Sequence, residues 1–387
     1  MRKICIFTGT RADYGILKPL LREIRQDPGL TLQILVSGMH LAPEFGLTYR
    51  EIEEDGFEID AKVEMLLSSD SPTGICKSTG LGLIGFSEAL ERLQPDLVVI
   101  LGDRFEAFAM ATATMIGKRP IAHLHGGELT FGAIDEAFRH AITKMSHLHF
   151  TSTEEYRQRV IQLGENPAQV FNVGALGVEA IRTLPLLKKD VLEQNLEFSL
   201  AEQFALVTFH PATLEQQTGE KQFADLLLAL EAFPKLRLIF TKANADNGGR
   251  AINTMIDQYV AQNHQRAITF TSMGQTRYFS AMRYAAMVLG NSSSGILEAP
   301  TFGVPTINIG DRQKGRLRAT SVIDSPPDSK SIQEAISKAL SPQFSEAAKQ
   351  TTNPYEQTRT ARQITAALKE FDLAQIVKKE FYDFPKL

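Results

Sequence analysis

A serine-rich loop is the first feature of this chain that could do chemistry. The stretch GNSSSGILEAPTFG, Gly290 to Gly303, follows a short apolar run and leads at once into a predicted helix start. Backbone N–H groups at such a point carry partial positive charge and lack partners, so they bind anions such as phosphate. The residues that would supply N–H or hydroxyl donors are Ser292, Ser293, Ser294 and Gly295.

Charged side chains near this loop favour a phosphate ligand over the simpler alternative, an ordinary N-capped turn. Glu298, one turn into the predicted helix, could hold a ribose diol. The basic residues Arg312, Lys314 and Arg316 come one strand later and could close on the same anion. The chain has no Gly-x-x-x-x-Gly-Lys-Ser/Thr motif and no Asp-x-Asp pair. A diphosphate would therefore be held by N–H groups and arginine, without an obligatory metal.

Carboxylates and histidines gather in the first half of the chain, where they could move protons. Asp103 follows an apolar run in LGDRFEAFAMA, and the stretch HLHGGELTFGAIDEAFRHAITKMSH begins 20 residues later with His125, Glu128 and Asp135 inside it. Asp103 alone would be expected to cap a helix, and Asp135 with Arg139 has the i,i+4 spacing of an ordinary ion pair. Together these residues favour acid/base catalysis by carboxylates and a histidine over a metal site.

Two polar residues follow predicted strands in the second half. His210 comes directly after an apolar run and before Pro211, which fixes the turn, and Asn244 follows another apolar run. A histidine at such a place can donate to a phosphate or protonate a leaving group. A lone histidine is more often structural, but its position at a strand end favours a functional role for His210.

Short apolar runs alternate with amphipathic stretches along the whole chain. Because these runs are apolar throughout, they predict parallel strands covered on both faces, joined by helices in doubly wound sheets. Ligands bind beyond the carboxyl ends of such strands, so we expect an active site in an interdomain cleft. The predicted strands are Lys3–Thr8, Leu32–Ser37, Asp96–Leu101, Pro120–Leu124, Leu148–Thr151, Val170–Val173, Ala205–Phe209, Leu236–Thr241, Ala267–Thr271, Met287–Leu289 and Thr306–Ile309.

The strand–helix alternation weakens between Ala180 and Gln203, and we place the domain junction there. The prediction is an α/β chain with two Rossmann-like domains, residues 1–178 and residues 179–356. A C-terminal helical segment, about residues 357–387, is expected to pack back onto the first domain. With 387 residues, 43% of them hydrophobic, the chain can form two cores of ordinary size.

The overall composition limits the kinds of partner and the cellular compartment that the protein is expected to have. A net charge of −4 predicts neither a nucleic acid nor an anionic membrane as partner. Cys5 and Cys76 are too few for a disulfide framework or a cysteine-rich metal site, and they fit a reducing compartment. No signal peptide and no long apolar stretch is present, so we expect a soluble, cytoplasmic protein.

Several stretches, taken in order, resemble one family. TGTRADYG, LGDRFEA, GGE, GAIDE, FRHAITK, FHP and GNSSSGILEAPTFGVPTINIGDRQKGR are similar to the hydrolysing UDP-N-acetylglucosamine 2-epimerases of sialic acid biosynthesis. They also resemble the epimerase half of the bifunctional animal enzyme, over roughly residues 1–330. The resemblance implies a GT-B-type fold in which the second domain binds UDP. It also implies a UDP-sugar substrate, no cofactor, and a homodimer or homotetramer.

The resemblance also implies a reaction and roles for residues. Such enzymes expel UDP from C1 while the C2 proton is removed, and water then adds to the resulting glycal, giving N-acetylmannosamine. Asp103 and Asp135 match acid/base carboxylates of the family. Many members have Glu-Gly-Gly-Glu where this chain has His125-Gly-Gly-Glu128, so His125 or Glu128 takes the third catalytic role. The positions that match nucleotide-binding residues are Arg11, His210, Ser292, Ser293, Glu298 and Arg312.

Three other functions remain open from the sequence. One is a hydrolysing 2-epimerase for UDP-2,4-diacetamido-2,4,6-trideoxyglucose (UDP-N,N'-diacetylbacillosamine), toward legionaminic acid, because the motifs match the nucleotide and the mechanism but not the substituents at C4 and C6. Another is a GT-B glycosyltransferase, which the carboxylate-rich GGELTFGAIDEAFRH stretch disfavours. The third is a non-catalytic nucleotide-sugar sensor, which the presence of both Asp103 and Asp135 disfavours.

Overall fold

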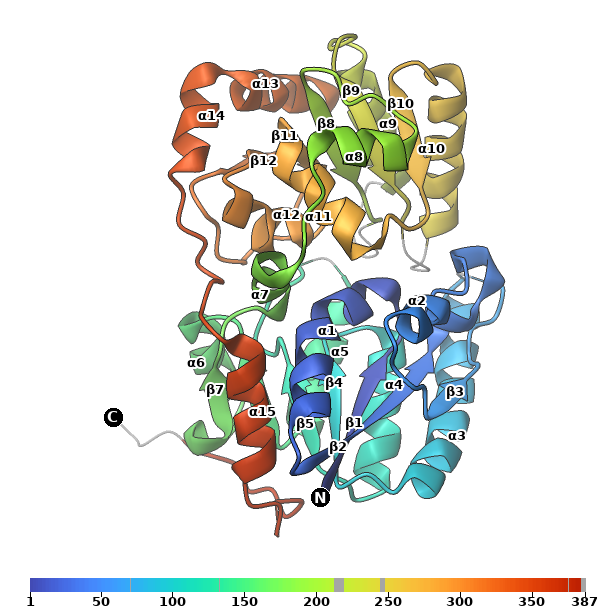
Figure 1. Ribbon diagram of the computed structural model, residues 1–387, viewed down its shortest axis with the longest axis vertical. Helices are drawn as coiled ribbons and strands as arrows, with labels where there is room; N and C mark the ends of the chain where they lie inside the picture. The colour runs from blue at the N-terminus through green and yellow to red at the C-terminus, as the bar shows by residue number, and fades with distance from the viewer. Residues whose placement is uncertain (70, 132, 212–218, 244–247, 375, 384–387) are drawn as a thin grey trace. The chain divides into compact units, whose positions relative to one another are not determined.

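The computed structural model describes residues 1–69, 71–131, 133–211, 219–243, 248–374 and 376–383. The chain forms two compact units. The first consists of Met1–Glu128, Asp135–Ala180 and Tyr355–Leu387, and the second of Leu129–Ile134 and Ile181–Pro354. Both units are therefore built from separate stretches of chain, and each is described by itself below (Figure 1).

The first unit is built on a seven-stranded parallel sheet in the order β3-β2-β1-β4-β5-β6-β7. Strand β4, which reads Leu-Val-Val-Ile-Leu, is buried along its whole length, as expected for a strand with helices on both faces. The strands are β1 (Arg2–Thr8), β2 (Leu30–Ser37), β3 (Ala61–Val63), β4 (Leu97–Leu101), β5 (Ile121–Leu124), β6 (Leu148–Thr151) and β7 (Val170–Asn172).

Helices connect the strands of this sheet and enclose its two largest apolar cores among the described residues. Helix α1 shows why the sequence folds in this way. Thr10 and Asp13 form a capping box at its start, and apolar residues recur at helical spacing along its buried face. The helices are α1 (Arg11–Gln26), α2 (Tyr49–Glu54), α3 (Pro72–Leu93), α4 (Phe105–Ile116), α5 (Asp135–Met145), α6 (Glu154–Gln162), α7 (Leu176–Thr183, across the boundary of the units) and α15 (Thr360–Glu370).

The end of the chain completes the first unit. Helix α15 lies beside α1 (Figure 1), and the Thr360 hydroxyl donates to the carbonyl of Val173 at 2.6 Å. The hydroxyls of Tyr355 and Tyr156 lie 2.8 Å apart in the interior. The C-terminal segment is therefore an integral part of this unit.

The second unit contains a six-stranded parallel sheet in the order β10-β9-β8-β11-β12-β13. Its first strands repeat the 3-2-1-4 order of the first unit, which is the Rossmann arrangement. The strands are β8 (Phe204–Thr208), β9 (Arg237–Thr241), β10 (Ala267–Phe270), β11 (Met287–Gly290), β12 (Thr306–Ile309) and β13 (Val322–Ser325). The helices are α8 (Lys189–Leu196), α9 (Gly219–Leu230), α10 (Gly249–Gln262), α11 (Gly274–Tyr284), α12 (Ser294–Leu297), α13 (Ser329–Leu340) and α14 (Pro342–Lys349).

All eleven strands predicted from the sequence are present, but two further strands were missed. Both are edge strands, β3 in the first sheet and β13 in the second. Each has an exposed charged residue, Lys62 or Asp324, in a short run. Because an edge strand is only partly covered, it lacks the continuous apolar pattern by which the buried strands were predicted.

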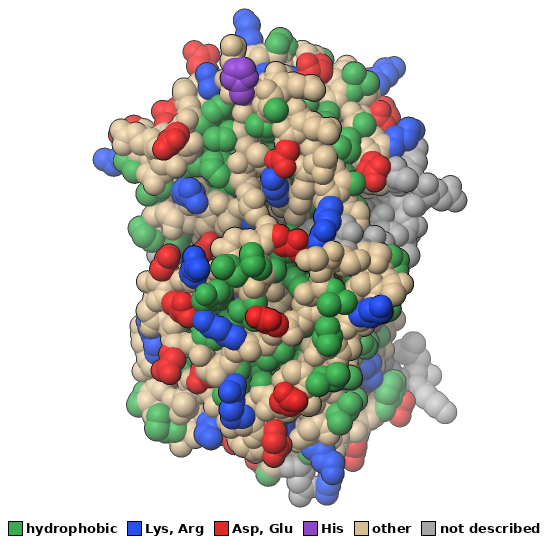
Figure 2. Space-filling model, turned by 90° about the vertical axis from the view of Figure 1, so that its right-hand side faces the viewer, with side chains coloured by type: hydrophobic (Ala, Val, Ile, Leu, Met, Phe, Trp, Pro, Cys, Tyr) green, Lys and Arg blue, Asp and Glu red, His purple; other side chains and the backbone are tan. Residues whose placement is uncertain are grey.

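The outer surface carries mixed charge. Figure 2 shows one face of the molecule, on which basic and acidic side chains are interspersed among hydrophobic and neutral ones. Among the described residues, no helix has both the length and the apolar character needed to cross a bilayer.

A buried ionic cluster ties the C-terminal segment to the first sheet. Glu165 is fully buried, and its carboxylate lies 2.8 Å from His149 Nε2 and 2.6 Å from Lys144 Nζ. Lys379 Nζ also lies 2.6 Å from this carboxylate and donates to the carbonyls of Lys144 and Ser146. Opposite charges and hydrogen bonds therefore compensate for the desolvation of Glu165.

This cluster should make stability depend on pH. Burial raises the pKa of the Glu165 carboxyl, but His149, Lys379 and Lys144 together lower it to about 2, below its ordinary value of 4.5. Its stabilising contribution is therefore complete above pH 4.5 and is lost as the pH falls from 4.5 to 2. We expect Glu165→Gln to lower the free energy of unfolding by about 2 kcal/mol at about pH 6, with solvent screening allowed for.

Urea unfolding of wild type and variant, repeated from about pH 6 down to about pH 3, checks this expectation. The difference between the two proteins should shrink as the pH falls. A difference that stayed constant over this range would show that the Glu165 charge does not stabilise the fold.

Candidate active site

Polar side chains cluster at the carboxyl ends of the strands in both units. In the first unit they follow β1, β4 and β5, which are neighbours in the sheet, and in the second they follow β8, β11 and β12, which are also neighbours. The point between β1 and β4, and that between β8 and β11, is where the strand order reverses. Open α/β sheets bind ligands at such switch points.

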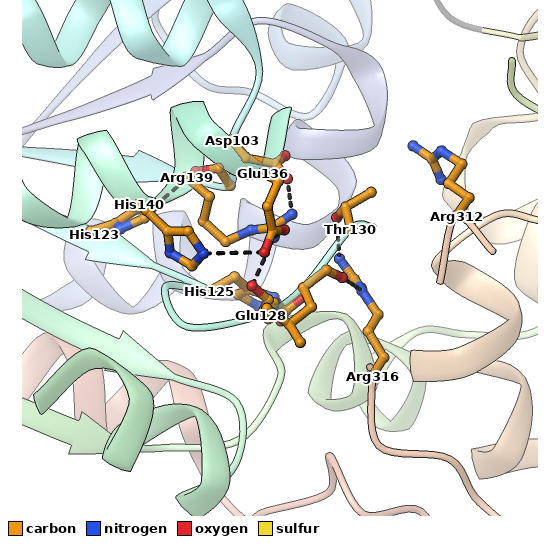
Figure 3. Close-up of polar contacts among 12 residues, drawn as sticks. Asp103, His123, His125, Glu128, Thr130, Glu136, Arg139, His140, Arg312 and Arg316 are labelled. Atoms are coloured by element: carbon orange, nitrogen blue, oxygen red, sulfur yellow. Dashed lines mark hydrogen bonds and ion pairs between the residues drawn. The ribbon is translucent and has the colours of Figure 1, made fainter. Parts of the chain in front are cut away.

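Asp103 is held by a buried arginine. It follows Gly102, whose φ of 76° turns the chain out of β4, and it precedes α4. Arg139 Nη2 donates to Asp103 Oδ2, and Nη1 donates to Glu136 Oε2 and to the carbonyl of Glu128, both at 2.8 Å (Figure 3). Arg139 is only 2% exposed. Two carboxylates thus compensate for its burial, and the guanidinium in turn fixes the position of Asp103.

His123 is hydrogen-bonded to the turn that precedes Asp103. Burial lowers its pKa to about 3, so the imidazole is neutral near pH 7. Nε2 lies 2.7 Å from the carbonyl of Gly102 and Nδ1 lies 3.1 Å from Thr143 Oγ1. Because a carbonyl only accepts, Nε2 carries the proton and Nδ1 accepts from the hydroxyl. His123 therefore positions the turn before Asp103.

His125 and Glu128 form a hydrogen-bonded pair after β5. His125 has a left-handed backbone, with φ of 65°, and its Nδ1 lies 2.8 Å from Glu128 Oε1 (Figure 3). Ser152 Oγ also donates to Glu128 Oε1, at 3.0 Å. An ionised carboxylate only accepts, so Nδ1 carries the proton and Nε2 of the neutral ring keeps its lone pair. Within the described residues Nε2 has no hydrogen-bond partner, which leaves it available to a substrate proton.

The remaining candidates of the first unit lie on helix starts. Arg11 is the first residue of α1, directly after the cap residue Thr10. Asp135 is the first residue of α5, the helix that also carries Glu136 and Arg139. A single helix thus contributes Asp135 and the arginine that holds Asp103.

In the second unit, His210 and Asn291 tie two strand ends together. The amide N–H of His210 donates to Asn291 Oδ1, and Asn291 Nδ2 donates to the carbonyl of His210, both at 2.7 Å. The loop after β8 and the serine loop after β11 are therefore fixed to each other by a reciprocal pair of hydrogen bonds.

Gly290 is required at the start of the serine loop. Its φ is 135°, and a Cβ at this position would lie 1.9 Å from the carbonyl oxygen of Thr208. We expect Gly290→Ala to lower the free energy of unfolding by about 3 kcal/mol or more, because backbone must move to relieve the clash. Gly274→Ala is the matched control, since Gly274 has φ of 64° but open space around it, and its cost should be about 1 kcal/mol.

Thermal unfolding of the two alanine variants, monitored by circular dichroism, checks this prediction. If Gly290→Ala and Gly274→Ala lowered Tm equally, the close approach to Thr208 would not matter.

The serine loop differs from the expected helix start. Helix α12 is a single turn, Ser294–Leu297, followed by a 3-10 turn at Ala299–Phe302. The N–H of Ser294 donates to Ser292 Oγ at 3.3 Å and the N–H of Gly295 donates to the carbonyl of Ser292 at 3.2 Å, so these two N–H groups, expected to lack partners, are bonded within the loop. Glu298 is buried at the end of the turn. Because one turn has only a small dipole, an anion here would be bound by individual N–H groups, hydroxyls and arginine.

The three basic residues after β12, which are Arg312, Lys314 and Arg316, have different hydrogen-bond or ion-pair partners. Arg312 Nη1 and Gln313 Nε2 both donate to the carbonyl of Asn291, at 3.0 and 2.9 Å. Lys314 is exposed and pairs with Asp311, whereas Arg316 is buried and bonded to Leu129 and Thr130. Of the three basic side chains expected to gather at one anion, Arg312 contacts the serine loop.

The sequence did not single out several residues of these networks. Arg139 was expected only as an ion-pair partner of Asp135, and Ser152 and Gln313 were not singled out. Their partners Asp103, Glu128 and Asn291 lie 36, 24 and 22 residues away in the sequence. Asn244, which the sequence suggested, lies outside the described residues. Across the part of the chain that the structure describes, no group of three or more His, Cys, Asp or Glu residues is placed to hold a metal ion.

Comparisons with known proteins agree with this arrangement. A family model described as UDP-N-acetylglucosamine 2-epimerase matches residues 22–369. A Campylobacter jejuni protein named GDP/UDP-N,N'-diacetylbacillosamine 2-epimerase (hydrolyzing) is 47% identical over 343 residues, covering 89% of this chain and 88% of its own. An Escherichia coli protein named polysialic acid biosynthesis protein P7 is 39% identical over 388 residues, covering 100% of this chain and 98% of its own.

The fold is shared with solved structures. The crystal structure of UDP-GlcNAc 2-epimerase from Neisseria meningitidis bound to UDP-GlcNAc superposes with a TM-score of 0.79 at 18% identity, covering 95% of this chain and 99% of that one. The prediction of a GT-B-type fold with two Rossmann-like domains is confirmed.

Proposed function

Because the chain belongs to the UDP-N-acetylglucosamine 2-epimerase family, we propose that it is a hydrolysing 2-epimerase of a UDP-linked 2-acetamido sugar. The observation that carries the proposal is the linkage of two proton-transfer groups in the first unit. Arg139 binds both Asp103 and the carbonyl of Glu128, and Glu128 orients His125. A carboxylate and an imidazole held in this way can remove a proton and return one.

The proposed reaction has two steps. A base takes the proton from C2 as the C1–O bond breaks, which gives a glycal and UDP. Water then adds its hydroxyl to C1, while an acid delivers a proton to C2 from the opposite face. The net reaction consumes one water and yields UDP and the 2-epimer of the free sugar.

We assign the proton transfers to Asp103 and His125. The removal of a weakly acidic C2 proton and its return on the other face need two separate groups. Asp103, whose side chain is 22% exposed, can act on one face of the sugar ring. His125 can act on the opposite face through Nε2, since Glu128 holds the Nδ1 of His125. Asp135 is assigned to the same site as a further acid/base carboxylate at the start of α5.

We assign nucleotide binding to the loops of the second unit. Departure of UDP needs donors at the developing diphosphate charge. His210 and Arg312 lie on two loops that are both bonded to Asn291, and the serine hydroxyls and the N–H groups of Ser292 and Ser293 follow Asn291 directly in the chain. These donors need no metal to bind a diphosphate.

Two substrates are supported by particular relatives. The 47% identical Campylobacter jejuni protein is named for GDP/UDP-N,N'-diacetylbacillosamine, and this favours the 2,4-diacetamido-2,4,6-trideoxy sugar as substrate. A Neisseria meningitidis protein that is 33% identical over 343 residues is named UDP-N-acetylglucosamine 2-epimerase, and this favours UDP-N-acetylglucosamine. We propose the diacetamido sugar as the preferred substrate, on the higher identity, and UDP-N-acetylglucosamine as the second candidate.

A proton NMR time course in D2O tests the function and the substrate together. Each UDP-sugar, and the GDP form of the diacetamido sugar, is incubated with the protein. We expect release of the nucleoside diphosphate together with a free manno-configured sugar that carries deuterium at C2. Turnover of UDP-N-acetylglucosamine in preference to the diacetamido sugar would reverse the substrate assignment. Transfer to an acceptor without deuterium incorporation would instead indicate a glycosyltransferase.

We also propose that the enzyme works in the cytoplasm as a homodimer or homotetramer. The reducing compartment implied by its two unpaired cysteines supports the first point. Light scattering of the purified chain measures the mass of the assembly directly. A monomer at all concentrations would contradict the second point.

A further inference from the structure

One short segment connects Glu128 to Asp135, two residues of the proposed acid/base site in the first unit, but itself belongs to the second unit. Residues Leu129–Ile134 belong to the second unit, although Glu128 before them and Asp135 after them belong to the first. The placement of this segment therefore affects both flanking carboxylates through chain continuity alone.

Arg316 anchors the start of this segment. Its Nε donates to the carbonyl of Leu129 at 2.7 Å, and its Nη2 lies 3.3 Å from Thr130 Oγ1 (Figure 3). Arg316 is 8% exposed and Thr130 is 3% exposed, so these bonds are shielded from water. Leu129 also packs so closely on Gly315 that a Cβ there would lie 2.5 Å from its side chain.

Two successive carbonyls are thus each held by a buried arginine. Arg139 donates to the carbonyl of Glu128, and Arg316 donates to the carbonyl of Leu129. A charged donor to a backbone carbonyl makes a strong bond. The two peptide units that follow Glu128 are therefore each held by one arginine, which limits where the Glu128 carboxylate can lie.

The loop that carries Arg316 is the one that contacts the serine loop. Its Arg312 and Gln313 donate to the carbonyl of Asn291, and Asn291 is bonded in both directions to His210. A series of hydrogen bonds thus connects His210 to Asn291, and Asn291 to the loop that carries Arg316. Arg316 in turn donates to the carbonyl of Leu129.

We propose that Arg316 is a positioning residue, which ties the backbone after Glu128 to the nucleotide-binding loop so that Glu128 holds His125 in its reactive orientation. The effect on catalysis rests on the proposed function, whereas the effect on the segment rests on the contacts alone. A displacement of a reacting group by about 1 Å costs on the order of 10²-fold in rate. Loss of the Arg316 anchor should therefore slow the chemistry without removing the groups that bind UDP.

The test compares Arg316→Met with Arg316→Lys and Lys349→Met. The lysine variant can still donate one bond to the Leu129 carbonyl. Lys349 is a cation of the same unit on α14, with its side chain 60% exposed and paired with Glu346, and serves as the control. Each protein is checked for an unchanged circular dichroism spectrum. Hydrogen exchange of the amides in residues 128–135 is then measured without ligand, and kcat, KM and the dissociation constant for UDP are measured separately.

We expect Arg316→Met to speed amide exchange in this segment and to lower kcat about 10²-fold. Its affinity for UDP should stay within about twofold of wild type, Arg316→Lys should recover part of kcat, and Lys349→Met should behave as wild type. Unchanged exchange in Arg316→Met, or a fall in UDP affinity parallel to the fall in kcat, would overturn the proposal. If the wild type turned over neither sugar nucleotide, the proposed function would fail, and the exchange measurement would still decide the role of Arg316.

Discussion

Replacement of Asp103 by asparagine is expected to lower kcat about 10³-fold while the affinity for UDP stays within about twofold of wild type. The amide keeps an oxygen that can accept from Arg139, so the local hydrogen bond survives. It cannot take up or deliver the C2 proton. The nucleotide-binding groups lie on other loops and do not depend on this carboxylate.

Steady-state UDP release and wash-in of solvent deuterium at C2 measure this effect. Both should fall together, because both need the same proton transfer. Asp96→Asn is the matched control, because Asp96 lies at the opposite, amino end of β4, is exposed, and accepts a hydrogen bond from the N–H of Lys3. A full rate in Asp103→Asn would remove Asp103 from the proton-transfer scheme. An equal loss in Asp96→Asn would indicate a general effect of charge.

Changes at His125 should alter the rate of proton transfer. His125→Gln removes the Nε2 lone pair that faces no partner in the described structure, and we expect kcat to fall about 10² to 10³-fold. His125→Glu places at this position the carboxylate that many family members have. A carboxylate can again take up or deliver a proton, so this variant should regain part of kcat.

Values of kcat and of solvent deuterium wash-in at C2, measured for wild type, His125→Gln and His125→Glu, separate this role from a structural one. A purely structural histidine would leave the glutamate variant as slow as the glutamine variant. His264→Gln changes an exposed histidine of the second unit, serves as the control and should leave both values unchanged. If His125→Glu regained neither kcat nor deuterium wash-in, His125 would not be a proton-transfer group.

The sequence predicted the strands and the residues at their ends because both have local signals. A buried parallel strand is a continuous apolar run, and a charged residue directly after such a run must lie at the carboxyl end of the sheet. Asp103, His125 and His210 could be found in this way. Their supports could not, because Arg139 meets Asp103 across 36 residues and Asn291 meets His210 across 81. Contacts at such separations follow from the strand order, which periodicity does not reveal.

Two features of the loops also escaped prediction for physical reasons. The helix after the serines is a single turn because Pro300 and the left-handed Gly303 follow at once and end the regular structure. The attachment of Leu129–Ile134 to the second unit depends on Arg316, which lies 187 residues away from Leu129. Nothing in the composition of that segment distinguishes it from a loop of the first unit.

The order in which the chain is synthesised gives the C-terminal segment a further consequence. The first unit needs Tyr355–Leu387, so it cannot be completed when its N-terminal stretch leaves the ribosome. At 5–20 residues per second, synthesis of the intervening residues 181–354 takes about 9–35 s. During this time the apolar surface of α1 that α15 later covers is open. The apolar surface of the nascent first unit therefore stays open to aggregation and to chaperone binding until α15 has been synthesised.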